Sequence, residues 1–203
     1  VLDKTARFDK QFHPTSLPLV GRDAEMDLLL NNWGKCQQEN MRIILVSSDP
    51  GYGKSRLIES FRKRIAQNTF EHLLFFCSPF HINSPLFAIT DQIRKITLID
   101  KTDDIETQLS KIEALMTSLD IELSHSVPLI ADLLLIPYES RYQPQNWSAF
   151  EHKQKMLGLL VEICHIMSQQ SPLLIVLEDA HWIDPTSLDL LNLLIQQLEQ
   201  DKI

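Results

Sequence analysis

The sequence predicts an α/β fold in which helices cover both faces of a parallel sheet. Three short apolar runs, each bounded by turn-forming residues, have the composition of strands that are buried on both faces. They lie at residues 42–48, 72–77 and 172–179. Each run is followed by a segment with helical periodicity, and strands that alternate with helices are typical of a parallel sheet.

The size, charge and cysteine content limit the class of protein. A chain of 203 residues is long enough for one substantial α/β domain. Its net charge of −8 opposes binding to nucleic acid or to an anionic membrane. No apolar run approaches the roughly 18 residues of a membrane-spanning helix, and the first residues lack a leader pattern. The cysteines are odd in number and lack CxxC spacing, so we expect buried thiols and a cytoplasmic protein. They are Cys36, Cys77 and Cys164.

The first part of the chain is predicted to contain a linker and two helices. Residues 1–18 mix charged residues with two prolines and show no periodicity, which predicts a linker that leads into a domain at residues 19–203. A helix is expected from Asp23 to about Gly34. After the first strand and a turn with two glycines, four apolar residues share one face of a second helix. These residues are Leu57, Ile58, Phe61 and Ile65.

The second part is predicted to be mainly helical. The second strand leads into a helix that begins near Pro85. Residues 98–147 contain an acidic helical stretch, an apolar stretch and a polar loop, which together predict a helical insert. A long helix is expected at about 148–169, and Asp184 should cap a last helix that starts at Pro185. We expect the inner face of this last helix to consist of Leu188, Leu191, Leu194, Ile195 and Leu198.

The turn after the first strand contains the strongest functional motif. It matches the phosphate-binding P-loop pattern G-x-x-x-x-G-K-[ST], except that Ser48 replaces the first glycine. In a P-loop, backbone N–H groups surround phosphate oxygens, which requires small residues such as Gly51 and Gly53 before a helix N-terminus. Lys54 is expected to neutralise the β and γ phosphates, and the Ser55 hydroxyl to join a magnesium shell. The expected nucleotide-binding residues here are Pro50, Gly51, Tyr52, Gly53, Lys54, Ser55 and Arg56.

A pair of acidic residues ends the third strand, at the position of a Walker B motif. We assign Glu178 to magnesium and Asp179 to the attacking water, although the two roles could be exchanged. With Lys54, these two residues form the predicted catalytic set. Two acids that end a strand can also be solvated caps, so the interpretation depends on the P-loop as well.

Four stretches together resemble the ATPase domain of the signal-transduction ATPases with numerous domains, the STAND class. They are PLVGRDAEMDLLL, DPGYGKSRL, CSPFHINSPLF and LLIVLEDAHWIDPTSLDLL, and the resemblance spans roughly residues 19–200. Within that class, the chain is most similar to the AAA-type domain that follows the catalytic domain in many class III adenylate cyclases. Relatives of that domain occur in large transcriptional regulators and protein kinases.

The resemblance implies further site residues and a missing part of the sheet. Val20, Gly21 and Arg22 match a VGR box that lies near the adenine and phosphates of ATP. His181 matches the histidine of an HW pair, as a reporter of the nucleotide state or as a packing residue beside Trp182. In this class the sheet order is 5-1-4-3-2, and the sequence ends before the fourth strand. We therefore expect a three-layer P-loop ATPase domain of which only the N-terminal part is present.

Three functions fit these features. The first is a regulatory switch that binds ATP with Mg²⁺, hydrolyses it slowly and controls effector and sensor domains of the same longer chain. Its activity in isolation should be weak because no arginine finger can be assigned. The second is a nucleotide-binding module without turnover, suggested by Ser48 and by a glutamate at the usual aspartate position. The third, a small-molecule kinase, is disfavoured because the insert at 98–147 is acidic. ATP rather than GTP follows from the resemblance, and the oligomeric state stays open.

Overall fold

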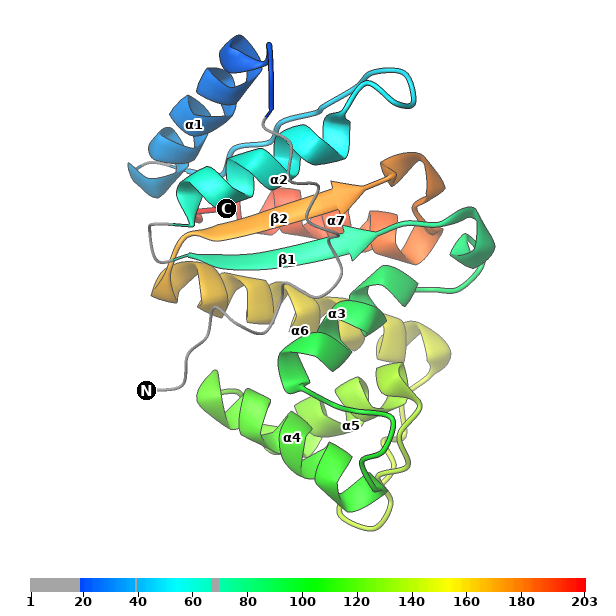
Figure 1. The fold of residues 1–203 in the computed structure, drawn as a ribbon. Helices are drawn as coiled ribbons and strands as arrows, with labels where there is room; N and C mark the ends of the chain where they lie inside the picture. Colours follow the sequence, from blue (N-terminus) through cyan, green and yellow to red (C-terminus); the bar gives the residue numbers. More distant parts are fainter. Residues whose placement is uncertain (1–18, 39, 67–69) are drawn as a thin grey trace.

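The computed structural model describes residues 19–38, 40–66 and 70–203, so the predicted linker at 1–18 lies outside the described part. Its centre is a parallel pair of strands, β1 (Glu71–Phe76) and β2 (Leu173–Glu178). Phe76, the last residue of β1, pairs in register with Glu178, the last residue of β2. The two strands therefore end at the same edge, and helices pack on both faces of the pair (Figure 1).

One face of the sheet is covered by α1 (Asp23–Gln38) and α2 (Lys54–Ile65). Their buried side chains form a small core that includes Trp33, whose ring makes an edge contact with Phe61 at a centroid distance of 6.4 Å. Leu174 of β2 packs against the same core. The helix α1 continues past the predicted end at Gly34, because Cys36 extends the buried stripe by one more turn. The six buried residues of this core are Met26, Leu29, Trp33, Leu57, Phe61 and Ile65.

The other face is covered by the longer helical part of the chain. The helices are α3 (Phe87–Thr97), α4 (Ile105–Ser118), α5 (Leu123–Leu134), α6 (Ala149–Gln170) and α7 (Pro185–Gln197). They share one core with Leu73, Phe75 and Leu173, which point away from the α1–α2 side. Side chains of neighbouring strand residues point to opposite faces, so both faces of β2 are apolar. This is the pattern that predicted a covered strand at 172–179.

The prediction of a strand at 42–48 is wrong. Residues 42–48 form no strand, and Ile43 and Leu45 are 66% and 87% exposed. A strand exists only where its backbone pairs with a neighbour, and an apolar composition cannot supply that neighbour. Among the described residues, the backbone bonds near this segment join Met41 N–H to Glu199 O at 3.1 Å and Arg42 N–H to Ile203 O at 2.8 Å.

Residues 199–203 lie between the start of residues 42–48 and the start of β2. Besides accepting hydrogen bonds from residues 41 and 42, they accept one from Leu173 N–H, whose distance to Lys202 O is 2.9 Å. Asp201 attaches residues 199–203 to α6, because its buried carboxylate accepts a hydrogen bond from the Ser168 hydroxyl. The backbone of residues 42–48 and the second edge of β2 are therefore connected through residues 199–203.

The predicted inner face of α7 is also wrong in part. Leu194 and Leu198 are buried as expected, but Leu188 is 43% exposed, and Leu191 and Ile195 are only half-buried. The buried stripe contains Leu190 and Ser187 instead. Leucines occupy several faces of this helix, so its periodicity alone does not fix the rotation. The Asp184 cap, which binds the Ser187 hydroxyl, holds the first turn against the core.

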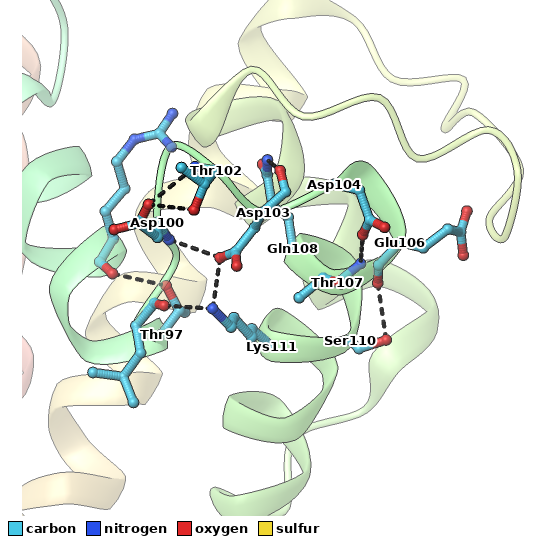
Figure 2. Close-up of polar contacts among 12 residues, drawn as sticks. Thr97, Asp100, Thr102, Asp103, Asp104, Glu106, Thr107, Gln108, Ser110 and Lys111 are labelled. Carbon is cyan, nitrogen blue, oxygen red and sulfur yellow. Dashed lines mark hydrogen bonds and ion pairs between the residues drawn. The ribbon is translucent and has the colours of Figure 1, made fainter.

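The insert is helical, as predicted, and its acidic entrance is held together by one lysine. Figure 2 shows that Lys111 of α4 reaches back to the loop between α3 and α4, where Nζ lies 2.7 Å from Leu98 O and 2.5 Å from Asp103 Oδ2. Asp104 caps α4 by accepting a hydrogen bond from Thr107 N–H at 2.7 Å. The carboxylates of Asp103 and Asp104 thus have hydrogen-bond partners within the insert, which gives both residues a structural role.

The three cysteines are free thiols. Cys36 and Cys164 are buried as predicted, and burial raises the pKa of Cys164 to about 12. Cys77, directly after β1, is only half-buried. None of the helices in the described part is both long and apolar enough to span a membrane.

Candidate nucleotide-binding site

The P-loop residues form an open turn that runs directly into α2. Gly51 and Gly53 have φ angles of 85° and 80°, in the left-handed region that favours glycine. Tyr52 N–H closes the turn on Asp49 O at 3.4 Å. Gly53 is the N-cap of α2 and, as a glycine, offers no side chain to cap the first N–H groups of the helix. The uncapped N-terminus and the glycine turn provide backbone donors suited to an anion.

Lys54 folds back over this turn. Its ammonium donates hydrogen bonds to Ser48 O at 2.7 Å and to Asp49 O at 3.2 Å. Both acceptors are backbone carbonyls of residues that precede the two glycines, so the ammonium lies against the start of the turn. These two carbonyl oxygens give the ammonium no countercharge, and it can exchange them for phosphate oxygens.

The structure brings Ser55 and Glu178 together from opposite ends of the chain. The Ser55 hydroxyl donates to Glu178 Oε2 at 2.9 Å. The other carboxylate oxygen, Oε1, is buried and has no hydrogen-bond partner among the described residues. A hydroxyl beside a carboxylate with one unused oxygen fits Mg²⁺, which is commonly bound by one or two protein oxygens together with phosphates and water. No described group of three or more His, Cys, Asp or Glu side chains could form a metal site of its own.

Asp179 follows Glu178 in a strained backbone conformation. Its φ and ψ of 54° and 42° are left-handed, which aspartate tolerates better than most residues. Its carbonyl accepts a hydrogen bond from Trp182 N–H at 2.9 Å, which closes the short 3-10 helix η4 (Ala180–Trp182). Asp179 is exposed, as is His181, whose ring centroid lies 4.9 Å from that of Trp182. These side chains are thus placed at the rim of the same sheet edge as Glu178.

Arg22 connects the VGR segment to the P-loop. One guanidinium nitrogen, Nη2, donates to Tyr52 O at 3.0 Å, and Nη1 pairs with Glu25 at 2.5 Å. The Arg22 hydrogen bond lowers the pKa of Glu25. Gly21 has a φ of 72°, which turns the chain sharply before α1. Val20 is 83% exposed, so the segment approaches the loop through its arginine.

A groove of about 250 Å³ lies between α1, residues 44–48 and the P-loop. Its wall is apolar where Leu28 and Ile44 contribute, and its rim is polar where Arg22 and Lys54 contribute. Tyr52 also lines the groove and is 62% exposed. The groove wall also includes Gly53, but the other predicted binding residues lie outside it. These are Val20, Gly21, Pro50, Gly51, Ser55 and Arg56.

The sequence predicts Asp184 only as a helix cap. In the structure its carboxylate also accepts a hydrogen bond from Leu86 N–H, 98 positions earlier in the chain. Cys77 lies close enough to Asp184 and Asp179 for their charges to act on its thiol. Burial, and then these two negative charges, raise the pKa of the thiol. A helix-cap pattern indicates the first role of Asp184, but nothing in the sequence pairs this residue with the end of a loop so far away.

Comparisons with known proteins agree with this geometry. A family profile described as an AAA ATPase domain matches residues 18–203. An uncharacterized protein of Rhizobium meliloti (strain 1021), R02095, is 27% identical over 178 residues. The match covers 86% of this chain and 17% of that protein, so the chain spans less than a fifth of this curated relative. No solved structure gave a significant match. Because the family profile extends over nearly all described residues and over the P-loop and acidic pair alike, the chain belongs to the AAA ATPase domain family.

Proposed function

We propose that the chain binds ATP with Mg²⁺ and hydrolyses it slowly, as the regulatory switch of a longer signalling protein. The observation that carries the proposal is the hydrogen bond between Ser55 and Glu178, with Lys54 on the adjoining loop. Three groups that a nucleoside triphosphatase needs, a cationic side chain, a metal-binding hydroxyl and a carboxylate, are thereby close to one helix N-terminus.

Each residue has a distinct part in this proposal. The N–H groups from Gly51 to Ser55 hold the phosphates, and Lys54 exchanges its two carbonyl contacts for phosphate oxygens. Ser55 and Glu178 hold Mg²⁺, which neutralises charge on the phosphates when bound. Asp179, exposed beside Glu178, orients the attacking water. Arg22 fixes the position of the loop through Tyr52 O.

We also propose that residues 19–203 form the N-terminal part of a larger P-loop domain. Residues 199–203 join residues 41 and 42 to the second edge of β2, which supports a larger sheet at this edge. The match covers 17% of a much longer relative, which supports a multidomain protein. We propose an adenylate cyclase as the effector. The free thiols support a cytoplasmic location.

Single-turnover hydrolysis of radiolabelled ATP by the full-length protein tests the proposal. We expect Mg²⁺-dependent binding by calorimetry and slow phosphate release in the wild type. Asp179→Asn should bind ATP and release no phosphate, whereas Asp189→Asn, a surface control on α7, should behave as the wild type. Tight binding without release in the wild type would identify a binding module without turnover. Absence of any binding of Mg·ATP would contradict the proposed function.

A further inference from the structure

Two loops leave the sheet side by side and are joined at both of their ends. The β1 exit loop, residues 77–86, follows β1, and the acid turn, residues 179–184, follows β2; both leave the edge to which the strand arrows point (Figure 1). At their start, Cys77 N–H donates to Glu178 O at 3.1 Å. At their far end, Leu86 N–H donates to Asp184 Oδ1 at 3.3 Å. The two loops therefore form a closed unit.

Asp184 is the centre of the far connection. It is 6% exposed, and its Oδ1 accepts hydrogen bonds from Leu86, Thr186 and Ser187 N–H, the last two at 3.0 Å. Its Oδ2 accepts the Ser187 hydroxyl at 2.5 Å. Three of these four donors belong to Thr186 and Ser187 of α7, whereas the Leu86 N–H belongs to the other loop. A buried carboxylate with this many donors holds them in fixed positions, because any donor that leaves would lose a charge-assisted hydrogen bond in a site without access to water.

Local contacts hold the end of the β1 exit loop next to α3. Ser84 N–H donates to His81 O at 2.9 Å, and the His81 ring stacks on Phe87 with ring centroids 3.5 Å apart. Leu86 itself is buried and has a left-handed φ of 58°. Its carbonyl accepts the first helical bond of α3, from Thr90 N–H at 2.8 Å. Leu86 is thus both the partner of Asp184 and the N-cap of α3.

Movement of α3 in turn reaches the insert. Arg94 near the end of α3 donates to Leu134 O at the end of α5, at 2.5 Å. Lys111 of α4 holds Leu98 O, directly after α3, at 2.7 Å. The three helices also share the larger hydrophobic core. Packed helices of this kind move as units, because close-packed interiors do not deform gradually.

We propose that Asp184 is a positioning residue that couples nucleotide binding at Glu178 and Asp179 to the position of α3, α4 and α5. The proposal rests on the proposed function, since it names how that site is read by the rest of the domain. A nucleotide that shifts the acid turn must shift Asp184, and Asp184 carries Leu86 and α3 with it. By linkage, a partner that holds the insert in one position would change nucleotide affinity by the same factor.

Hydrogen exchange of α3 in the full-length protein tests the coupling, with Mg²⁺ and a non-hydrolysable ATP analogue at concentrations that saturate each variant. Asp184→Ser keeps a good helix cap but is too short to reach Leu86 as well. Asp184→Asn keeps an oxygen at the Oδ1 position. Asp189→Ser makes the same chemical change at an exposed site of α7 that pairs with Lys153. Asp184→Thr is a second short cap in case the serine variant does not fold.

We expect the analogue to change amide exchange in α3 of the wild type, Asp184→Asn and Asp189→Ser. In Asp184→Ser the analogue should bind, as calorimetry would show, and the change in α3 should be lost. A response that persists in Asp184→Ser or Asp184→Thr would overturn the coupling, as would a wild type that binds the analogue without any change in α3. A wild type that fails to bind the analogue would instead contradict the proposed function and remove the coupling with it.

Discussion

The Ser55 hydroxyl donates a hydrogen bond to Glu178 Oε2 at 2.9 Å, although the two residues are 123 positions apart. One belongs to the first turn of α2 and the other ends β2. The parallel pairing of β1 and β2 places the end of β2 at the sheet edge to which the strands point, and the P-loop faces the same edge (Figure 1). This contact joins the P-loop motif to the acidic pair, which are two separate motifs in the sequence.

We expect Ser55→Ala to weaken ATP binding only when Mg²⁺ is present. The hydroxyl is a candidate metal ligand, and loss of groups that hold or orient a metal lowers metal affinity by about 10–100-fold. Calorimetry with and without EDTA measures the effect. Ser55→Thr keeps the hydroxyl and should retain the magnesium dependence. An alanine variant whose binding responds to Mg²⁺ as the wild type does would exclude Ser55 from the metal shell.

Lys54→Met should weaken nucleotide binding by about tenfold or more, because a hydrogen bond to a charged group contributes about 1.5–3 kcal/mol. Its effect on the free energy of unfolding should be small, since the contacts with Ser48 and Asp49 lie at the surface. Lys63→Met is the matched control on the same helix, where the lysine pairs with Glu59. Equal affinities of the two variants would argue against phosphate binding by Lys54.

Two glycine-to-alanine changes should have opposite effects on stability. Gly53 has a φ of 80°, and an L-residue in the left-handed region costs roughly 1–2 kcal/mol, although space for a Cβ is open. Gly158 lies on the exposed face of α6 with no atom near a Cβ, so alanine should stabilise the protein by about 0.5–1 kcal/mol. Urea midpoints measure both, and a shift of the same sign would refute the assigned loop conformation.

Asp201→Ala should destabilise the protein by about 1–3 kcal/mol, because buried donors lose their acceptor. The Asp201 carboxylate accepts from Ser168 Oγ at 2.8 Å and contacts His165 Nδ1 at 2.7 Å. We also expect faster amide exchange at residues 41 and 42, whose N–H groups bind the same segment. Glu199→Ala, an exposed change nearby, should alter stability by less than about 0.5 kcal/mol. Similar unfolding midpoints for the two variants would show that Asp201 does not anchor residues 199–203.

Cys77 should become more reactive when a neighbouring charge is removed. Burial, followed by the charges of Asp184 and Asp179, raises the pKa of its thiol. Asp179→Asn removes one negative charge that opposes the thiolate, so the pKa should fall and alkylation by iodoacetamide should speed up at a fixed pH below it. The pH profile of alkylation, resolved by peptide mass spectrometry, measures the shift. Cys164, buried with a pKa of about 12, serves as the unreactive control. A profile that does not move would place the Asp179 carboxylate away from the thiol.

Sequence patterns predicted the structure correctly where a residue and its hydrogen-bond partner are only a few positions apart in the sequence. Helix α7 begins at Pro185 after the Asp184 cap, and α6 begins after Ser148, whose capping box with Glu151 is complete. A cap needs only donors that are three residues away, so its pattern is visible in the sequence. The glycines of the P-loop have the positive φ angles that the motif requires, for the same reason.

Sequence patterns gave wrong predictions where an element depends on contacts with a distant segment of the chain. Residues 42–48 have the composition of a buried strand, but a strand forms only by backbone pairing with a neighbour. Among the described residues, the segment forms such a backbone hydrogen bond to a distant residue only at its beginning, at Arg42. The rotation of α7 was also wrong, because leucines on several faces fit more than one helix orientation and only the packing against α6 selects one.

The sequence by itself determined a P-loop, an acidic pair at the end of a strand and the order of nearly all helices, because each depends on residues within a few positions of one another. Only the tertiary structure decided that Ser55 contacts Glu178, that Arg22 holds the P-loop and that Asp184 ties two loops together. The physical reason is chain connectivity. Hydrogen bonds and packing at short separation are encoded in local patterns, whereas contacts between distant segments form only after the sheet and its helices have brought those segments to one edge.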